Sequence, residues 1–327
     1  MTEKRRKTEK KLLTAAMLAA LLGFCGCSQE AGSPAQTTAP TSAAELTEES
    51  VAETMRPDRF AESDFAALPD GVQTKLTDRR IVQTGTVGET EYQFTIDLEK
   101  WANNTSPAQI VTISELFWEC YPRMYQRFGA AGESPTEVTL AIENEGYEIA
   151  ETSGNFVHLH DQWLHDYPTD YDCLTHEFAH VIQNGWNGET LEFDSYTERF
   201  ADYCRFVYAF DRGSYNDACW TLQTVEAEPD RESSVRFLVW LDYTCSTPDH
   251  DLMLTYFDVC RNRQYPSGEW DAAWQEIFAG TALEGMSIDE VWDMYAASDF
   301  AYLFSVADLP ETSELLAAYD VRGKIGS

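Results

Sequence analysis

A histidine–glutamate–histidine pattern lies within residues 175–183, which read T-H-E-F-A-H-V-I-Q. His176 and His180 are four residues apart, so in a helix both imidazoles lie on one face and can reach the same metal ion. Zinc in hydrolytic sites suits two neutral imidazoles and a carboxylate, and one position stays open for water. Glu177 would lie beside that position, where it can take a proton from attacking water and deliver it to a leaving amine. The spacing therefore predicts a zinc centre for hydrolysis.

The third ligand is expected on the next predicted helix, which contains the stretch 197–203, T-E-R-F-A-D-Y. Glu198 and Asp202 are four residues apart and share one helix face. Glu198 can supply the carboxylate ligand, and Asp202 can accept the other N–H of a zinc-bound imidazole and so fix its tautomer. The alternative is that both residues belong to a solvated acidic face. The nearby H-E-x-x-H favours the ligand interpretation.

Together the two motifs resemble a known class of enzymes. A helix with H-E-x-x-H followed by a helix with E-x-x-x-D is the gluzincin pattern of thermolysin-like metallopeptidases. A closer likeness is to the plant basic secretory protein family, which also occurs in bacteria and which the chain resembles over roughly residues 92–297. The segments that carry this likeness are 149–155, 174–183, 198–205, 235–238 with Trp240, and Trp292 with Tyr295.

The resemblance implies a zincin-like metallopeptidase domain that binds Zn²⁺ and cleaves a peptide or protein substrate. It also implies that strand 156–160 forms the rim of the cleft, where its backbone would pair with an extended peptide. The chain departs from the family at Arg199, where Gly is usual after the third ligand, and at Arg231, where a Tyr is usual. It is also acidic rather than basic. These departures concern substrate preference.

Several polar residues near the motifs have more than one candidate role. A further donor for the developing oxyanion is expected. The sequence leaves four candidates for it, namely Tyr196, Tyr203, Arg236 and His250. His158 and His160 share one face of a predicted strand, where a second metal pair is the less favoured alternative to a solvated or hydrogen-bonded face. Cys173, one turn before His176, could compete for zinc, but a buried thiol is favoured.

The order of the predicted elements indicates an α+β fold with an N-terminal mixed sheet and a mainly helical C-terminal half. Alternation of apolar and polar residues predicts strands at 81–87, 92–96, 138–142, 149–150 and 156–160. Ser106-Pro107 predicts a helix start, Pro122 a kink or break, and Gly129 the end of the segment after that break. Further helices are predicted near 172–184, 195–210, 232–246, 250–262, 270–279 and 287–297. Gly185 and Gly280 are the expected C-caps, and Ser287 with Glu290 predicts a capping box.

The N-terminus resembles a bacterial lipoprotein signal peptide at residues 1–26. A basic segment precedes an apolar stretch, residues 12–26, which suits a signal peptide and is short for a membrane span. Cys27 would then be lipidated and would begin the mature chain, with Cys25 as the rival. Ordinary secretion and an uncleaved anchor are the alternatives. Residues 27–57 are rich in Ala, Thr, Ser, Glu and Pro, which is typical of a flexible linker.

Composition limits the partners of the chain. It has 23 basic and 56 acidic residues and a net charge of −33, which disfavours nucleic acid. The same charge disfavours anionic lipid, so only the acyl anchor would hold the protein at the membrane. Six cysteines follow Cys27, and their pairing stays open: Cys120, Cys173, Cys204, Cys219, Cys245 and Cys260.

We therefore expect a zincin-like peptidase domain at 58–300 and a C-terminal tail at 301–327. The expected function is zinc-dependent peptide hydrolysis on the extracellular face of the membrane, or as a secreted protein. The main alternative is a non-catalytic surface lipoprotein that binds a wall polymer or a host protein. A third interpretation is zinc-dependent hydrolysis of another kind of bond.

Overall fold

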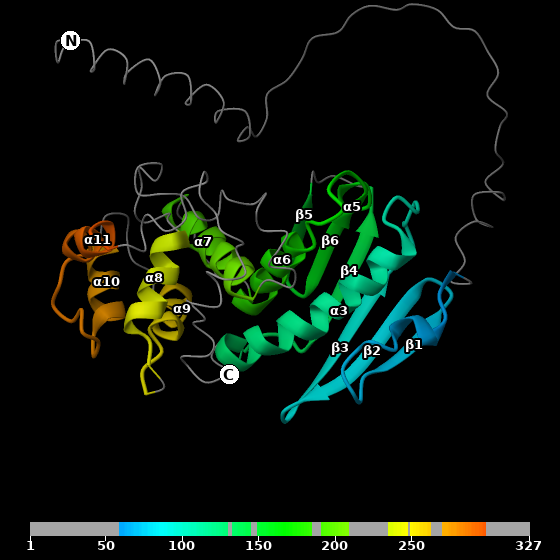
Figure 1. Ribbon diagram of the computed structural model, residues 1–327, viewed down its shortest axis with the longest axis horizontal. Helices are drawn as coiled ribbons and strands as arrows, with labels where there is room; N and C mark the ends of the chain where they lie inside the picture. The colour runs from blue at the N-terminus through cyan, green and yellow to red at the C-terminus, as the bar shows by residue number, and fades with distance from the viewer. Residues whose placement is uncertain are drawn as a thin grey trace, which may run out of the picture. The chain divides into compact units, whose positions relative to one another are not determined.

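A six-stranded mixed sheet forms the N-terminal part of the fold, with the strand order β1-β2-β3-β4-β6-β5 (Figure 1). The strands are β1 (Gln73–Thr77), β2 (Arg80–Val87), β3 (Thr90–Asp97), β4 (Glu137–Glu143), β5 (Ala150–Ser153) and β6 (Phe156–His160). The pairs β3–β4 and β4–β6 are parallel, and the other three pairs are antiparallel. β1 and β5 are therefore the two edges of the sheet.

Helices follow and accompany the sheet. They are η2 (Glu62–Phe65), α3 (Pro107–Met124), the π-helical turn η3 (Tyr125–Gly129), α5 (Trp163–Asp166), α6 (Asp172–Gln183), α7 (Leu191–Val207), α8 (Val235–Cys245), α9 (Leu252–Asn262), α10 (Trp270–Phe278) and α11 (Ile288–Ala296). In Figure 1, α3 crosses in front of the sheet and α8 to α11 gather at the left. The predicted α+β class, with a mixed sheet followed by helices, is confirmed.

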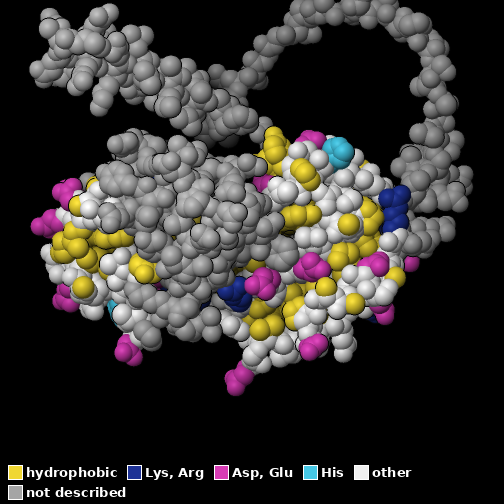
Figure 2. All heavy atoms as spheres, in the orientation of Figure 1, with side chains coloured by type: hydrophobic (Ala, Val, Ile, Leu, Met, Phe, Trp, Pro, Cys, Tyr) yellow, Lys and Arg dark blue, Asp and Glu magenta, His cyan; other side chains and the backbone are white. Residues whose placement is uncertain are grey.

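The computed structural model describes residues 59–129, 133–144, 149–184, 191–208, 235–247, 249–262 and 270–298. The predicted signal peptide, Cys27, the linker and the C-terminal tail lie outside these residues. So do Cys219, Arg231 and Gly185. No helix among the described residues is both long enough and apolar enough to cross a membrane. Acidic side chains are scattered over the face seen in Figure 2, whereas Lys and Arg appear at few points.

Most predicted elements occur near their predicted positions, and three details differ. β1 is absent from the predicted strands, because its sequence Q-T-K-L-T contains a single apolar residue. Pro122 does not break α3, which continues to Met124, since the neighbouring buried side chains hold the helix against the core and only one backbone donor is lost. The left-handed residue that ends α6 is Asn184, with φ of 48°, rather than the expected Gly185. Gly280 has the positive φ expected after α10.

The strand order corrects the prediction about the cleft rim. Strand 156–160, predicted to be the edge, is β6, and it lies between β4 and β5. β5 is the edge strand, and it borders the cavity that contains His176, His180 and Glu198. The local sequence pattern of a strand does not determine its order in a sheet, so this prediction was wrong for a topological reason.

An aromatic cluster fixes α6 on the sheet. Phe178 is fully buried and makes edge-on contacts with Phe94 of β3, at 5.9 Å between ring centroids, and with Phe117 of α3, at 5.4 Å. Phe94 and Phe117 stack at 4.1 Å. Phe178 is two positions from both His176 and His180, so it lies on the opposite side of the helix. Burial of this side chain therefore turns the two histidines away from the core.

A buried charged network holds the C-terminal helices in place. Arg127 of η3 donates to both carboxylate oxygens of Asp251, at 2.7 Å each, and to those of Asp242 of α8, at 2.8 and 3.2 Å. It also donates to the hydroxyl of Tyr203 on α7, at 2.8 Å, and Tyr203 donates to Asp242. Ser246 completes the set by donating to Asp242. Because Tyr203 is next to Asp202, this network fixes the part of α7 that faces α6.

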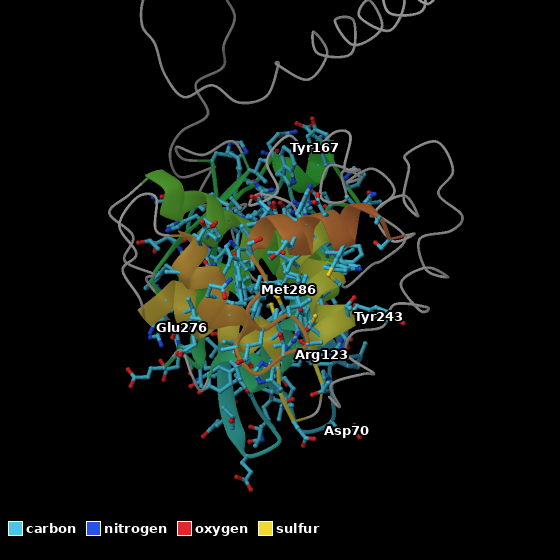
Figure 3. The ribbon with its side chains drawn as sticks, turned by 90° about the vertical axis from the view of Figure 1, so that its left-hand side faces the viewer. Asp70, Arg123, Tyr167, Tyr243, Glu276 and Met286 are labelled. Atoms are coloured by element: carbon cyan, nitrogen blue, oxygen red, sulfur yellow. The ribbon has the colours of Figure 1, made fainter. Side chains whose placement is uncertain are left out.

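Replacing Arg127 tests this network. In Arg127→Met, the fully buried carboxylate of Asp242 loses its cation, so the free energy of unfolding is expected to fall by about 3 kcal/mol. Arg123, labelled in Figure 3, is partly exposed, and Arg123→Met removes its ion pair with Glu119 within α3. This variant is the control, with an expected change of about 1 kcal/mol or less. Urea unfolding of both variants measures the difference. Equal losses in the two variants would contradict a buried structural role for Arg127.

Candidate metal centre

Three side chains that could ligate a metal converge at the surface between α6 and α7. They are His176, His180 and Glu198, and their ligating atoms all lie within 4.8 Å of one another. The Nε2 atoms of the two histidines are 3.0 Å apart, and the Glu198 oxygens lie 3.2 Å from His176 Nε2 and 3.5 Å from His180 Nε2. Ligands at about 2.0–2.1 Å from a tetrahedral ion are separated by about 3.3 Å, so these spacings suit such an ion.

The hydrogen bonds behind the two imidazoles determine which nitrogen faces the site. His176 Nδ1 lies 2.8 Å from Asp202 Oδ1, a carboxylate oxygen that only accepts. His180 Nδ1 lies 2.6 Å from Gln183 Oε1. The orientation of that amide is set because Gln183 Nε2 donates to the carbonyl of Thr197 at 2.8 Å. Both Nδ1 atoms therefore carry protons, and both Nε2 atoms can present lone pairs to a metal.

The convergence of acceptors makes the site attract a cation. Burial lowers the pKa of His176, but hydrogen bonds to Asp202 and Glu198 outweigh it and raise this pKa to about 10. Partial burial raises the pKa of Glu198, but the hydrogen bonds with His176 and His180 outweigh it and hold this pKa well below its usual range. In the metal-free chain a proton on His176 thus neutralises part of the negative charge, and a metal ion could replace it.

Glu177 lies beside this group and is held by the edge strand. Its side chain is mostly buried, and its Oε2 accepts a hydrogen bond of 2.7 Å from the hydroxyl of Thr152 on β5. The same hydroxyl is 3.1 Å from the backbone carbonyl of Glu177. α6 thus turns His176 and His180 toward α7, while Glu177 reaches toward β5.

A cavity of about 390 Å³ opens over these residues. Its walls come from β5 and the turn after it, from α6 and from α7. The lining residues are Ala150, Glu151, Thr152, Gly154, His176, Glu177, His180, Gln183, Thr197 and Glu198. All four predicted ligand and base residues therefore share one cavity, and Asp202 supports them from behind, with 8% of its side chain exposed.

The outer edge of β5 borders this cavity and is open as far as the described residues show, since no other described strand pairs with it. In an antiparallel pair, hydrogen-bonded and non-hydrogen-bonded positions alternate. His160 donates its backbone N–H to Ile149 at 2.8 Å, so positions 150 and 152 are non-hydrogen-bonded with β6. The backbone N–H and C=O groups of Ala150 and Thr152 therefore point away from β6, toward the open edge. Both residues also line the cavity.

The structure does not bring the four oxyanion candidates to this cavity. Tyr203 belongs to the Arg127 network, and Arg236 is fully buried on α8. Neither these two nor Tyr196 and His250 line the cavity as far as the described residues show. The oxyanion donor expected from the sequence is therefore not found among these candidates.

The other histidines and Cys173 lie outside the metal-ligating group in the described part of the chain. His158 is half-buried and pairs with Glu143 at 2.7 Å, and His160 accepts a bond from the backbone of Gln162 at 3.3 Å. The hydrogen-bonded strand face favoured for these histidines is confirmed. Cys173 is a buried thiol, and burial raises its pKa well above the usual range. Cys120, Cys204 and Cys260 are likewise buried thiols.

Gln183 and Thr152 contact the motif residues directly, although the sequence pattern predicted no role for either. Gln183 follows His180 by three positions, a spacing that places it on the same side of the helix. That spacing is visible in H-E-x-x-H-x-x-Q and could have identified the contact. No comparable signal exists for Thr152, because it meets Glu177 only when β5 packs beside α6.

Comparison of the chain with protein-family models and with curated proteins gave no match.

The raised pKa of His176 predicts how stability depends on pH when metal is removed. An ordinary histidine has a pKa of 6.5, against about 10 here, so the stabilisation is fully present below pH 6.5 and is lost as pH rises toward 10. The loss is at most about 1.4 kcal/mol per pH unit. Unfolding of the chelator-treated chain and of His176→Gln, between pH 6 and 9, measures it. The difference in free energy of unfolding between the chelator-treated chain and His176→Gln should become smaller as pH rises. A difference that stays constant over this pH range would contradict a proton on His176.

Gln183 is expected to contribute to metal affinity through His180. Gln183→Ala removes the acceptor for His180 Nδ1 and the bond to Thr197, so zinc affinity should fall by about 10-fold or more. Competition with a chromophoric chelator measures this affinity. Gln126→Ala, at an exposed position of η3, is the matched control and should bind as the unaltered chain does. Unchanged affinity in Gln183→Ala would show that His180 needs no such partner.

Proposed function

We propose that this protein is a zinc-dependent metallopeptidase with a zincin-like fold of the gluzincin type. We further propose that it acts outside the cell and is tethered to the membrane by a lipid on Cys27. The observation that carries the proposal is the convergence of His176, His180 and Glu198 in one cavity with Glu177 beside them. The likeness to the basic secretory protein family supports the same conclusion.

The residues present fit zinc. Two imidazoles and one carboxylate are ligands that zinc takes in hydrolytic sites, and their spacings agree with tetrahedral coordination. Both imidazoles are oriented by a hydrogen bond at Nδ1, as ligating histidines usually are. When bound, zinc would supply Lewis acidity toward the scissile carbonyl and would acidify a water molecule.

Glu177 is the residue assigned to proton transfer. Its carboxylate lines the cavity next to the ligand group and is largely shielded from bulk water. In the proposed reaction it takes a proton from the attacking water and delivers it to the nitrogen of the leaving amine. The two transfers balance, since the water oxygen becomes part of the new carboxyl group and the amine leaves protonated.

The edge of β5 supports a peptide as the substrate. Ala150 and Thr152 direct backbone donors and acceptors toward the open edge, and an extended peptide can add there as a further strand. Such a peptide would lie along the cavity wall with its backbone near Glu177. This arrangement favours a peptide over other hydrolysable substrates, which lack the regular spacing of amide groups.

Variants of the full chain test the proposal. About one zinc per chain is expected, and it should be lost or much weakened in His176→Ala and Glu198→Ala, as measured by elemental analysis. Glu177→Gln should keep zinc and lose hydrolysis of unstructured peptides by about 100-fold or more, measured by mass spectrometry. Glu119→Gln, on the exposed face of α3, is the control for loss of a carboxylate.

Two outcomes would contradict the proposal. Full activity in Glu177→Gln would remove the base from the mechanism. Tight zinc in a chain that hydrolyses none of the peptides, with or without Glu177, would favour the non-catalytic binding lipoprotein instead.

A further inference from the structure

Thr152 of β5 lines the cavity and also holds the proposed base. Its side chain is half-buried on the sheet face that meets α6, and its hydroxyl lies 2.7 Å from Glu177 Oε2. Both Glu177 oxygens near it, Oε2 and the backbone carbonyl, can only accept a hydrogen bond. The hydroxyl must therefore be the donor, and its single proton serves the closer oxygen, Oε2.

This bond restricts a side chain that would otherwise have several conformations. A glutamate has three rotatable side-chain bonds, and restricting them to one conformation costs conformational entropy that this hydrogen bond offsets in part. Glu177 lines a cavity of about 390 Å³, and Thr152 holds its carboxylate at the wall of that cavity. With Oε2 engaged by Thr152, Oε1 is the oxygen available to accept a proton.

The same residue belongs to the strand edge. The backbone N–H and C=O of Thr152 point toward the open edge, while its hydroxyl points to Glu177. A peptide added along β5 would bond to the backbone of the residue whose side chain holds the base. A peptide that restricts the motion of Thr152 by pairing with its backbone would therefore also restrict the Glu177 carboxylate, which is bound to the Thr152 hydroxyl.

We propose that Thr152 is a positioning residue that links peptide addition at β5 to the orientation of the Glu177 carboxylate. The inference rests on the proposed peptidase function. It assigns to Thr152 no contact with the metal ligands and no part in proton transfer itself.

Removal of the hydroxyl alone gives the sharpest test. Thr152→Val has nearly the same shape and keeps the backbone edge, so KM should stay within about 2-fold while kcat falls by about 10- to 100-fold, in line with misplacement of a catalytic group. Thr152→Ser restores the donor and should recover most of kcat. Thr84→Val, a half-buried threonine of β2 outside the cavity, is the matched control and should match the unaltered chain.

A second measurement does not depend on turnover. If Glu177 is the base as proposed, it should accept a proton from a peptide hydroxamate, so binding of this probe to the zinc-loaded chain should depend on the orientation of the Glu177 carboxylate. The affinity for the hydroxamate should fall in Thr152→Val and in Glu177→Gln. The double variant should bind the hydroxamate as tightly as Glu177→Gln alone does. Zinc content should be unchanged in all three.

Each other outcome overturns the inference in a recognisable way. Unchanged kcat and hydroxamate affinity in Thr152→Val would show that the bond does not position the base. A loss confined to KM would assign Thr152 to substrate binding only, and a loss of zinc would assign it to the structure of the site. Additive losses in the double variant would show that Thr152 acts apart from Glu177. Inactivity of the unaltered chain would instead refute the proposed function and the inference with it.

Discussion

Three electron-pair acceptors converge on one small volume, and the site depends on that constraint. His176 Nε2, His180 Nε2 and the Glu198 carboxylate lie 3.0–3.5 Å apart, and the Nδ1 protons of both histidines are engaged elsewhere. A positive charge among the three groups would stabilise this arrangement. A proton on His176 or a metal ion can supply that charge. The pKa of His176 is raised accordingly in the metal-free chain.

The surrounding fold supplies the rigidity that keeps these acceptors together. Phe178 anchors one side of α6 in an aromatic core, which directs His176 and His180 outward on the other side. α7 is held by two kinds of contact, the Arg127 network through Tyr203 and the bond from Gln183 to the Thr197 carbonyl. The second contact lies next to Glu198, so the same glutamine orients His180, one candidate ligand, and fixes the backbone beside another.

Local patterns predicted much of this arrangement, and long-range packing decided the rest. The spacing of His176 and His180 and the capping pair Ser106–Gln109 are encoded within one or two helical turns, so the sequence indicated both the convergence of the two histidines and the start of α3. The sequence did not predict that β5, rather than β6, is the edge strand. The residue pattern of each strand is compatible with either position in the sheet. Thr152 and Glu177 are 25 residues apart, and no short-range signal connects them.

The shortness of β5 determines the conformation of any partner that adds to it. The strand has four residues, and only Ala150 and Thr152 direct backbone groups outward. Hydrogen bonds to the backbone of only two residues cannot compensate for unfolding a compact protein, because the strands of such a protein are already paired. An added chain must therefore arrive extended and unpaired, as a terminus, a linker or an unfolded segment. If a peptide adds at this edge as proposed, selection would be by backbone accessibility, and folded neighbours would be spared whatever their sequence.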